Sequence, residues 1–505
     1  MSDVPTSFDA ALNPFSWRGW SRCWAVGSAL CAMVSVPQPL QAQAATPTPR
    51  LTVSGSLRTR VEAWNWFGAN PDGDYTYSGS LARLGAGQTR QRLDWQAELA
   101  VPFMFGLPEQ AVVPGSQGAM GMGANYYAAN DNSTNPAHIF IKQAFVRFKD
   151  LAGVTGQSLA VGRMEFVDGT ETAPRNATLA ALKRDRIAHR LLGNFIFTHV
   201  GRSLDGVQYG LNQGRRNITA IAARPTAGVF QVDGWGELDV GVVYGAFTRQ
   251  TGGSARYTGE WRVFGLGYRD YRDNVLKTDN RPLAERRLDT DTIGMGTFGG
   301  HYLGVATTGI GSIDVLGWGA AQVGSWGTLA HRAGAIAAEI GWQPASAKLR
   351  PWIRGGYAYS TGDGDANDDT HGTFFQVLPT PRVYARFPFF NLMNSRDGFG
   401  ELILRPTTRL SIRTDIHALS LADSADLWYQ GGGAFQPGTF GYVGRPSNAH
   451  TGLGALYDVS ADYTFNPHLV VTGYFGHTWG GAVTQAIYPG DRSAQFGYAE
   501  AVLRF

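Results

Sequence analysis

Apolar and polar residues alternate with a period of two along most of this chain, from Leu51 to the last residue, Phe505. Between residues 51 and 63 the odd positions are mostly apolar, whereas the even positions are polar and include Arg58. Side chains of a β-strand point alternately to its two faces, so the pattern predicts strands with one apolar and one polar face. It recurs over residues 92–101, 409–418, 456–465 and 498–505.

These segments are long, and they recur without a helical block of comparable weight. Strands that cross a bilayer at a tilt need about 9–11 residues each, which is longer than strands of soluble proteins. At roughly 25 residues for a strand and its connection, residues 45–505 provide about 18 strands. We therefore predict an all-β fold, a single transmembrane antiparallel β-barrel of about 18 strands (16–18). The alternative is a soluble, β-rich periplasmic protein.

The N-terminus has the features of a secretory leader. Arg18 and Arg22 precede an apolar run at 23–34, and Ala42-Gln43-Ala44 follows as a small-residue cleavage pattern. We expect residues 1–44 to be a signal peptide and residues 45–505 to form the barrel. Both cysteines of the chain lie in this leader. The expected location is the outer membrane of a Gram-negative bacterium, in contact with lipid and lipopolysaccharide.

Connections between the expected strands differ in length. Turns at 405–407 and 466–467 are short, whereas 102–135, 174–194, 270–289, 361–397 and 430–451 are long. Barrels of this kind have short periplasmic turns and long extracellular loops. The sequence therefore predicts both an orientation and which segments are exposed outside the cell.

The polar faces are rich in arginine, and the expected lumen is therefore charged. Guanidinium groups stay ionised and bind carboxylates in a bidentate manner, and rings of Arg or Lys favour anion passage. The alternative is that these groups are ordinary ion pairs that brace a barrel wall. The predicted pore-lining residues are Arg58, Arg60, Glu62, Arg92, Glu98, Arg147, Arg163, Glu165, Arg354, Arg409, Arg413 and Asp415.

One segment, 176–192, has an apolar stripe at helical spacing and a basic side made of Lys183, Arg184, Arg186 and Arg190. A basic helix in a long loop could fold into the lumen and narrow it. The alternative is an external helix that faces solvent or lipopolysaccharide phosphates.

The acidic run of Asp363, Asp365, Asn367 and Asp369 resembles the start of a calcium loop. Position six is Asp368 and position twelve is Phe374, where an EF-hand needs Gly and Glu, so an EF-hand is excluded. A looser structural Ca²⁺ site on an external loop remains a candidate, and no other metal or cofactor is predicted.

Composition and motifs argue against several other classes of protein. A net charge of +3 does not suggest nucleic-acid binding. The string Gly294–Gly299 matches GxGxxG but has no following helix, and no GxSxG motif occurs. We therefore expect a channel, not an enzyme.

Several segments, taken in order, resemble the alginate export family of outer-membrane β-barrels. They lie at 57–62, 142–146, 161–165, 201–207, 356–365, 417–421 and 426–429. The resemblance implies an 18-stranded barrel with an Arg-rich lumen, and the family's best-known members pass an anionic polyuronate outward from the periplasm. It also implies a periplasmic export partner.

Three functions remain open at this stage. The first is a channel for an anionic polysaccharide such as alginate, or for related uronate-type solutes. The second is an uptake porin for small anionic or sugar-acid solutes. The third is a barrel enzyme or surface adhesin, for which the sequence offers no constellation of residues.

Overall fold

The computed structural model describes residues 50–69, 73–254, 256–345 and 348–505. The chain divides into two units, residues 1–41 and 42–505, and all described residues belong to the second. The predicted signal peptide, residues 1–44, lies outside the described residues.

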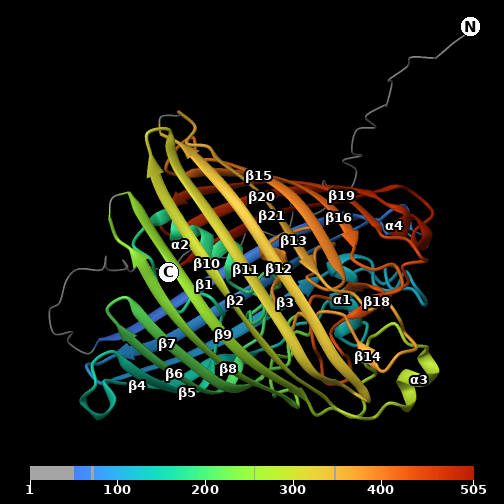
Figure 1. Ribbon diagram of the computed structural model, residues 1–505, viewed down its shortest axis with the longest axis horizontal. Coiled ribbons are helices and arrows are strands. Elements are labelled where there is room, and N and C mark those ends of the chain that lie inside the picture. Colours follow the sequence, from blue (N-terminus) through green and yellow to red (C-terminus); the bar gives the residue numbers. More distant parts are fainter. Residues whose placement is uncertain (1–49, 70–72, 255, 346–347) are drawn as a thin grey trace, which may run out of the picture. The chain divides into compact units, whose positions relative to one another are not determined.

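Eighteen strands of the described chain form one closed antiparallel barrel, in which the last strand, β21, pairs with the first, β1 (Figure 1). This confirms the predicted fold and strand number. The barrel strands are β1 Leu51–Asn65, β2 Tyr75–Thr89, β3 Leu93–Phe105, β4 Phe140–Lys149, β5 Gln157–Met164, β6 Leu204–Gln213, β7 Arg216–Pro225, β8 Val240–Gly252, β9 Tyr257–Asp270, β10 Ile293–Thr308, β11 Gly311–Trp326, β12 Leu329–Pro344, β13 Trp352–Ser360, β15 Ser395–Leu404, β16 Leu410–Leu421, β19 Gly452–Asn466, β20 Leu469–Gly480 and β21 Ser493–Arg504.

Alternation explains why these segments become barrel strands. On β8, Val243 is 63% exposed on the outward face, whereas its neighbour Tyr244 is 1% exposed and points inward. An apolar side chain exposed on the outer wall suits lipid, and the closed sheet leaves no backbone hydrogen bond unpaired at an edge.

The barrel closes at the C-terminal residue. The backbone N–H of Phe505 donates to the carbonyl of Gly55 (3.0 Å), and the N–H of Gly55 donates back to Phe505 (2.9 Å). A Cβ at position 55 would lie 2.2 Å from the Phe505 ring, so the absence of a side chain at Gly55 makes room for it.

The two ends of the barrel differ as predicted. One end, here called the short-turn end, has eight connections of two to seven residues, at 90–92, 150–156, 214–215, 253–256, 309–310, 345–351, 405–409 and 467–468. The other, the long-loop end, has nine connections, at 66–74, 106–139, 165–203, 226–239, 271–292, 327–328, 361–394, 422–451 and 481–492. All five predicted long connections fall at the long-loop end.

Helices and the remaining strands belong to the long loops. They are α1 Gly121–Ala129, α2 Ala177–Leu182, α3 Leu283–Leu288, α4 Ala482–Ile487, β14 Thr370–His371, β17 Trp428–Gln430 and β18 Val443–Arg445, with a π-helical turn at Lys183–Ile187 and a 3₁₀ turn at Pro381–Val383. A further 3₁₀ turn, Leu151–Gly153, lies in the short 150–156 connection. None of the described helices has the length and apolar character needed to cross a bilayer.

Candidate transport path

The loop between β5 and β6, residues 165–203, enters the barrel and reaches the strands of the opposite wall. The Lys183 ammonium lies 2.7 Å from a Glu260 carboxylate oxygen on β9, and Arg186 lies 2.9 Å from Glu339 on β12. All four side chains are buried. A charge this well removed from water is held in place by its partner, so these pairs fix the loop inside the lumen.

This inserted loop reaches close to the short-turn end. The side-chain oxygen of Asn176 accepts from the N–H of Leu179 (3.0 Å) and so begins α2. Thr178, the second residue of α2, accepts a hydrogen bond from Gln343 (2.8 Å), which is the penultimate residue of β12. The predicted helix is therefore shorter than 176–192, because it passes into the π-helical turn and ends at Ile187.

The basic side chains of this segment do not share one solvated face. Lys183, Arg186 and Arg190 are buried against the barrel wall, whereas the side chain of Arg184 is 69% exposed and pairs with Asp185. Arg190 donates to the carbonyl of Arg186 (2.7 Å). The segment thus lies inside the lumen, as the constriction hypothesis requires.

A second long loop, 361–394, packs beside the first. Leu378 forms an isolated parallel bridge with Leu192, and the Thr380 hydroxyl accepts from the N–H of Phe195 (3.0 Å). Burial in this low-dielectric contact lowers the pKa of His189 to about 4, so its imidazole is neutral beside Thr380. Together the two loops pack against the inner side of β8 to β13.

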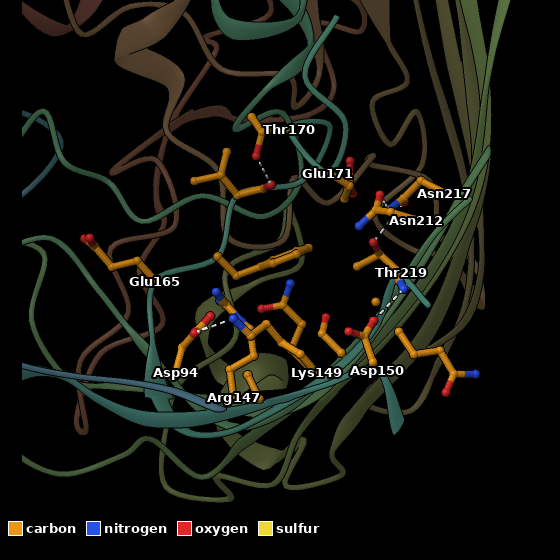
Figure 2. A pocket seen from close by; sticks show the side chains of 18 residues that line it. Asp94, Arg147, Lys149, Asp150, Glu165, Thr170, Glu171, Asn212, Asn217 and Thr219 are labelled. Atoms are coloured by element: carbon orange, nitrogen blue, oxygen red, sulfur yellow. Dashed lines mark hydrogen bonds and ion pairs between the residues drawn. The ribbon is translucent and has the colours of Figure 1, made fainter. Parts of the chain in front are cut away.

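Part of the remaining space lies against the β2 to β7 side of the wall, and further cavities lie beside α2 against β8 to β13. A cavity of about 540 Å³ is bounded by residues of β3 to β7, the 150–156 turn and the inserted loop (Figure 2). A neighbouring cavity of about 300 Å³ lies against β1 to β4, and the two share Asp94 and Arg147. We call these two cavities the vestibule; the turn residues that line it place it at the short-turn end.

Arg147 is the basic group that both parts of the vestibule share. Its guanidinium lies 5.1 Å from the centre of the Phe145 ring, and no described carboxylate forms an ion pair with it. The adjacent inward residue, Lys149, is instead paired with Asp94 (2.7 Å). Arg147 is therefore the cation of the vestibule that is available to a solute.

At its inner end the vestibule reaches Glu165, which is held by two cations. Arg83 donates to Glu165 (2.8 Å) and to Glu98 (2.6 Å), while the Lys142 ammonium lies 3.7 Å from Glu165. The Asn194 amide also donates to Glu165 (3.3 Å). These cations hold the pKa of the Glu165 carboxyl below its usual value despite its burial. An entering anion would meet two cations whose carboxylate partners it must replace.

Nine of the twelve predicted pore-lining residues do point inward, and most are paired. Arg60 binds Glu500 (2.7 Å) and Glu62 (3.2 Å), and Arg58 donates to backbone carbonyls of the inserted loop. A second network joins Arg354, Arg413 and Asp415 to Asp314, Glu339 and Glu401.

Three of the twelve lie elsewhere. Arg163 is on the outward face of β5, because it shares the parity of Val161, which is 44% exposed, and it pairs there with Asp205 (2.6 Å). Its predicted place in the pore is thus corrected. Arg92 and Arg409 are exposed residues of the turns before β3 and β16, and not members of a strand face.

Arginine gathers at the short-turn end. The eight turns contain seven arginines and one lysine, with Asp150 as their single acidic residue. The basic residues are Arg90, Arg92, Arg215, Arg256, Lys348, Arg350, Arg405 and Arg409. A mouth lined by one sign of charge raises the local concentration of ions of the opposite sign.

Sequence reasoning did not single out Arg83, Lys142 or Asn194. The strand parity of β2 would have placed Arg83 on the inner face with Leu81, which is buried. Lys142 lies at an irregularity in the β3–β4 register, where parity fails, and Asn194 lies in a loop.

The acidic run at 363–369 forms turns in the described structure. Asp363 accepts from the N–H of Asp365 (3.2 Å), and Asp365 accepts from that of Asn367 (3.0 Å). Asp369 supplies its backbone carbonyl to Ala330 (2.9 Å). These contacts account for the turn-forming composition, and a Ca²⁺ ion at this run stays a prediction.

Comparison with known proteins agrees with the barrel. A family described as alginate export matches residues 247–496. No curated protein sequence matches the chain. Among solved structures, the Pseudomonas aeruginosa outer membrane protein OpdK is similar with a TM-score of 0.52 and 10% identity, covering 90% of this chain and 99% of the other.

Two further P. aeruginosa structures are similar over 90% of this chain and 98% of theirs. They are OccK9 (OpdG), with a TM-score of 0.54 and 10% identity, and OccK2 (OpdF) in complex with glucuronate, with a TM-score of 0.52 and 8% identity. At such identities the likeness concerns the fold alone. The chain therefore has the fold of these outer-membrane barrels, and its residues 247–496 match the alginate export family.

Proposed function

We propose that this protein is an outer-membrane channel for anionic solutes of the uronate class. The observation that carries the proposal is the basic short-turn end, which opens into a vestibule containing the unpaired Arg147 and ending at Arg83 and Lys142. Guanidinium groups bind carboxylates in a bidentate manner, so a sugar acid can pass from one cation to the next.

The inner cations of the vestibule are already paired with carboxylates, which favours passage of an anion over its tight binding. Arg83 is already bound to Glu98 and Glu165, so an entering carboxylate exchanges with an internal one and gains little net binding. A channel requires sites that bind weakly and repeatedly. The vestibule volume, about 540 Å³ in its larger part, suits a small solute.

The fold relatives agree with this class of solute. One of them was solved with glucuronate and another with vanillate, and both ligands carry a carboxylate. This supports the class of solute but does not say which solute passes, because the sequence identity to these two proteins is only 8–9%.

Export of an anionic polysaccharide such as alginate is the second candidate, favoured by the family match and by the basic short-turn end. Export loads from the periplasm, where short turns normally lie, and a periplasmic export partner would contact those turns. A polymer would have to displace the inserted loop from its buried pairs with Glu260 and Glu339. This obstacle places export second. Lipopolysaccharide would contact the long-loop end in either case.

Planar-bilayer recordings of the purified barrel test the proposal. In a KCl gradient the reversal potential should show anion preference, and glucuronate should interrupt the current in brief events. Liposomes containing the barrel should swell in monomeric uronate and stay unchanged in a long polyuronate. Cation preference would contradict both candidates, whereas entry of the long polymer would replace the first by the second.

A further inference from the structure

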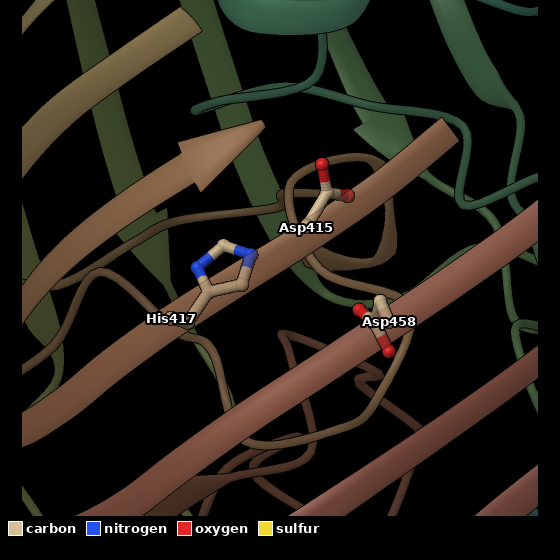
Figure 3. Close-up of side chains that lie close together, drawn as sticks. All are labelled: Asp415, His417 and Asp458. Atoms are coloured by element: carbon tan, nitrogen blue, oxygen red, sulfur yellow. The ribbon is translucent and has the colours of Figure 1, made fainter. Parts of the chain in front are cut away.

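Three acid–base side chains meet on the inner face of the β16–β19 pair, outside the vestibule. Asp415 and His417 lie two residues apart on β16, and Asp458 on β19 is the register partner of Asp415 (Figure 3). One ligand atom from each of the three lies within 4.8 Å of the other two. All three are buried, with His417 1% and Asp458 3% exposed.

Each of these side chains is held by a separate partner on its other atom. The Nδ1 of His417 lies 3.0 Å from the Asp397 carboxylate, and Asp415 accepts from Arg413 (2.7 Å) through Oδ2. The Tyr474 hydroxyl donates to Oδ1 of Asp458. A carboxylate behind the imidazole is the arrangement that orients histidine ligands in metal sites.

The remaining polar atom of each of these three side chains has no hydrogen-bond partner in the described structure. Oδ1 of Asp415, Nε2 of His417 and Oδ2 of Asp458 are all buried without a hydrogen bond in the described structure. A buried polar atom without a partner costs free energy comparable to a lost hydrogen bond, and here three of them belong to one cluster. Figure 3 shows the His417 ring turned with one nitrogen on the side of Asp415.

The charges of the side chains around this cluster also favour a bound cation. Asp415 shares Arg413 with Glu401 (3.0 Å), and Asp397 is paired with His417. Asp458 forms no ion pair with a described Lys or Arg. Buried carboxylates in excess are stabilised by a cation or by protons.

We propose that Asp415, His417 and Asp458 bind one divalent cation of the Zn²⁺ or Mn²⁺ type. One imidazole nitrogen and two carboxylate oxygens match the donors these ions accept, whereas Ca²⁺ prefers six or more oxygens. Ligands of a tetrahedral ion at ~2.1 Å lie ~3.4 Å apart, so binding draws the three atoms together by up to about 1.4 Å. The ion would join two neighbouring strands, independently of what the channel carries.

Metal content tests the site. The full-length barrel, prepared without a histidine tag and treated with EDTA, is equilibrated with micromolar Zn²⁺, Mn²⁺ or Ca²⁺, and bound metal is counted by mass spectrometry. About one Zn²⁺ or Mn²⁺ should remain per barrel and raise its unfolding temperature. His417→Gln and Asp458→Asn should lose the ion, and Asp397→Asn, which acts only through His417, should weaken binding by roughly 10- to 100-fold.

The matched control is Asp462→Asn, which removes a carboxylate from the same face of β19 four residues away. This variant should keep the full metal content. Heat-modifiable migration on an unboiled gel shows which variants are folded, and only folded protein is compared. Failure of folded wild-type protein to bind Zn²⁺ or Mn²⁺, retention of Ca²⁺ alone, or equal loss in Asp462→Asn would each overturn the proposal and leave protons as the balancing charge.

Discussion

Lys183 and Glu260 connect the inserted loop to the barrel wall across 77 positions of sequence, with the ammonium 2.7 Å from the carboxylate and both groups buried. His301 and Thr172 contact the same carboxylate, so Glu260 is the wall residue on which this part of the loop converges. The loop can narrow the lumen only while such contacts hold.

Replacing the cation at this contact should loosen the loop. Lys183→Met leaves Glu260 buried beside a neutral side chain, and loss of one partner of a buried pair costs roughly 3–5 kcal/mol. We expect larger and noisier single-channel currents in planar bilayers. Arg184→Met is the control, because Arg184 neighbours Lys183 but is exposed and pairs only with Asp185. Equal currents from both variants would show that the loop does not gate the lumen.

Arg147 should determine much of the ion preference of the vestibule. Arg147→Gln removes the cation that both cavities share, and the anion-to-cation permeability ratio should fall by roughly twofold, since local charge sets local ion concentration. Reversal potentials in a salt gradient measure this ratio.

Arg163→Gln is the matched control for that experiment. It removes the same charge from the outward face of the neighbouring strand, where Arg163 binds Asp205. The ratio should stay at the wild-type value. A fall of equal size in both variants would mean that overall charge, and not the vestibule, sets the preference.

The barrel could be predicted because its signal is local. Alternation is a property of neighbouring residues, so the strands, their approximate number and the difference between the two ends could all be inferred from sequence. The contacts of the inserted loop could not be inferred, since Arg186 pairs with Glu339 across 153 positions of sequence. The prediction that Arg163 lines the pore was wrong, because the sequence offers no reason to expect an ion pair on the outward face of a strand. The Asp415–Asp458 contact depends on the β16–β19 register, which alternation does not fix.

Arg354 should be the most important wall arginine for stability. Its guanidinium is buried among Asp314, Glu339 and Glu401. Arg354→Met leaves these carboxylates with less compensation, at a cost of roughly 3–5 kcal/mol. We expect the folded band on an unboiled gel to disappear at a lower temperature than in the wild type.

Arg350→Met serves as the control for that variant. Arg350 lies in the 345–351 turn and, among the described residues, donates to the carbonyls of Arg405 and Thr407. Its loss should leave the transition temperature unchanged. If both variants shift alike, the buried network is not what stabilises the wall.

Asp168 should make stability depend on pH at the base of the inserted loop. Its carboxylate accepts from the N–H of Leu192 (3.1 Å), and burial raises the pKa of Asp168 to about 6, above about 3.9 in an unfolded chain. The folded protein therefore holds a proton that the unfolded chain has lost between about pH 4 and 6, and this stabilisation declines as pH rises through that window.

Asp168→Asn isolates this effect, because its amide oxygen still accepts from Leu192 while its charge is gone. The wild-type protein should match the variant near pH 4 and fall below it by at most about 3 kcal/mol by pH 7, at 1.36 kcal/mol per pKa unit. Unfolding temperatures of the two proteins, measured in one detergent at steps across this range, give the difference. A difference that stays constant with pH would mean that Asp168 is ionised in the folded barrel throughout, with its charge balanced by Arg262.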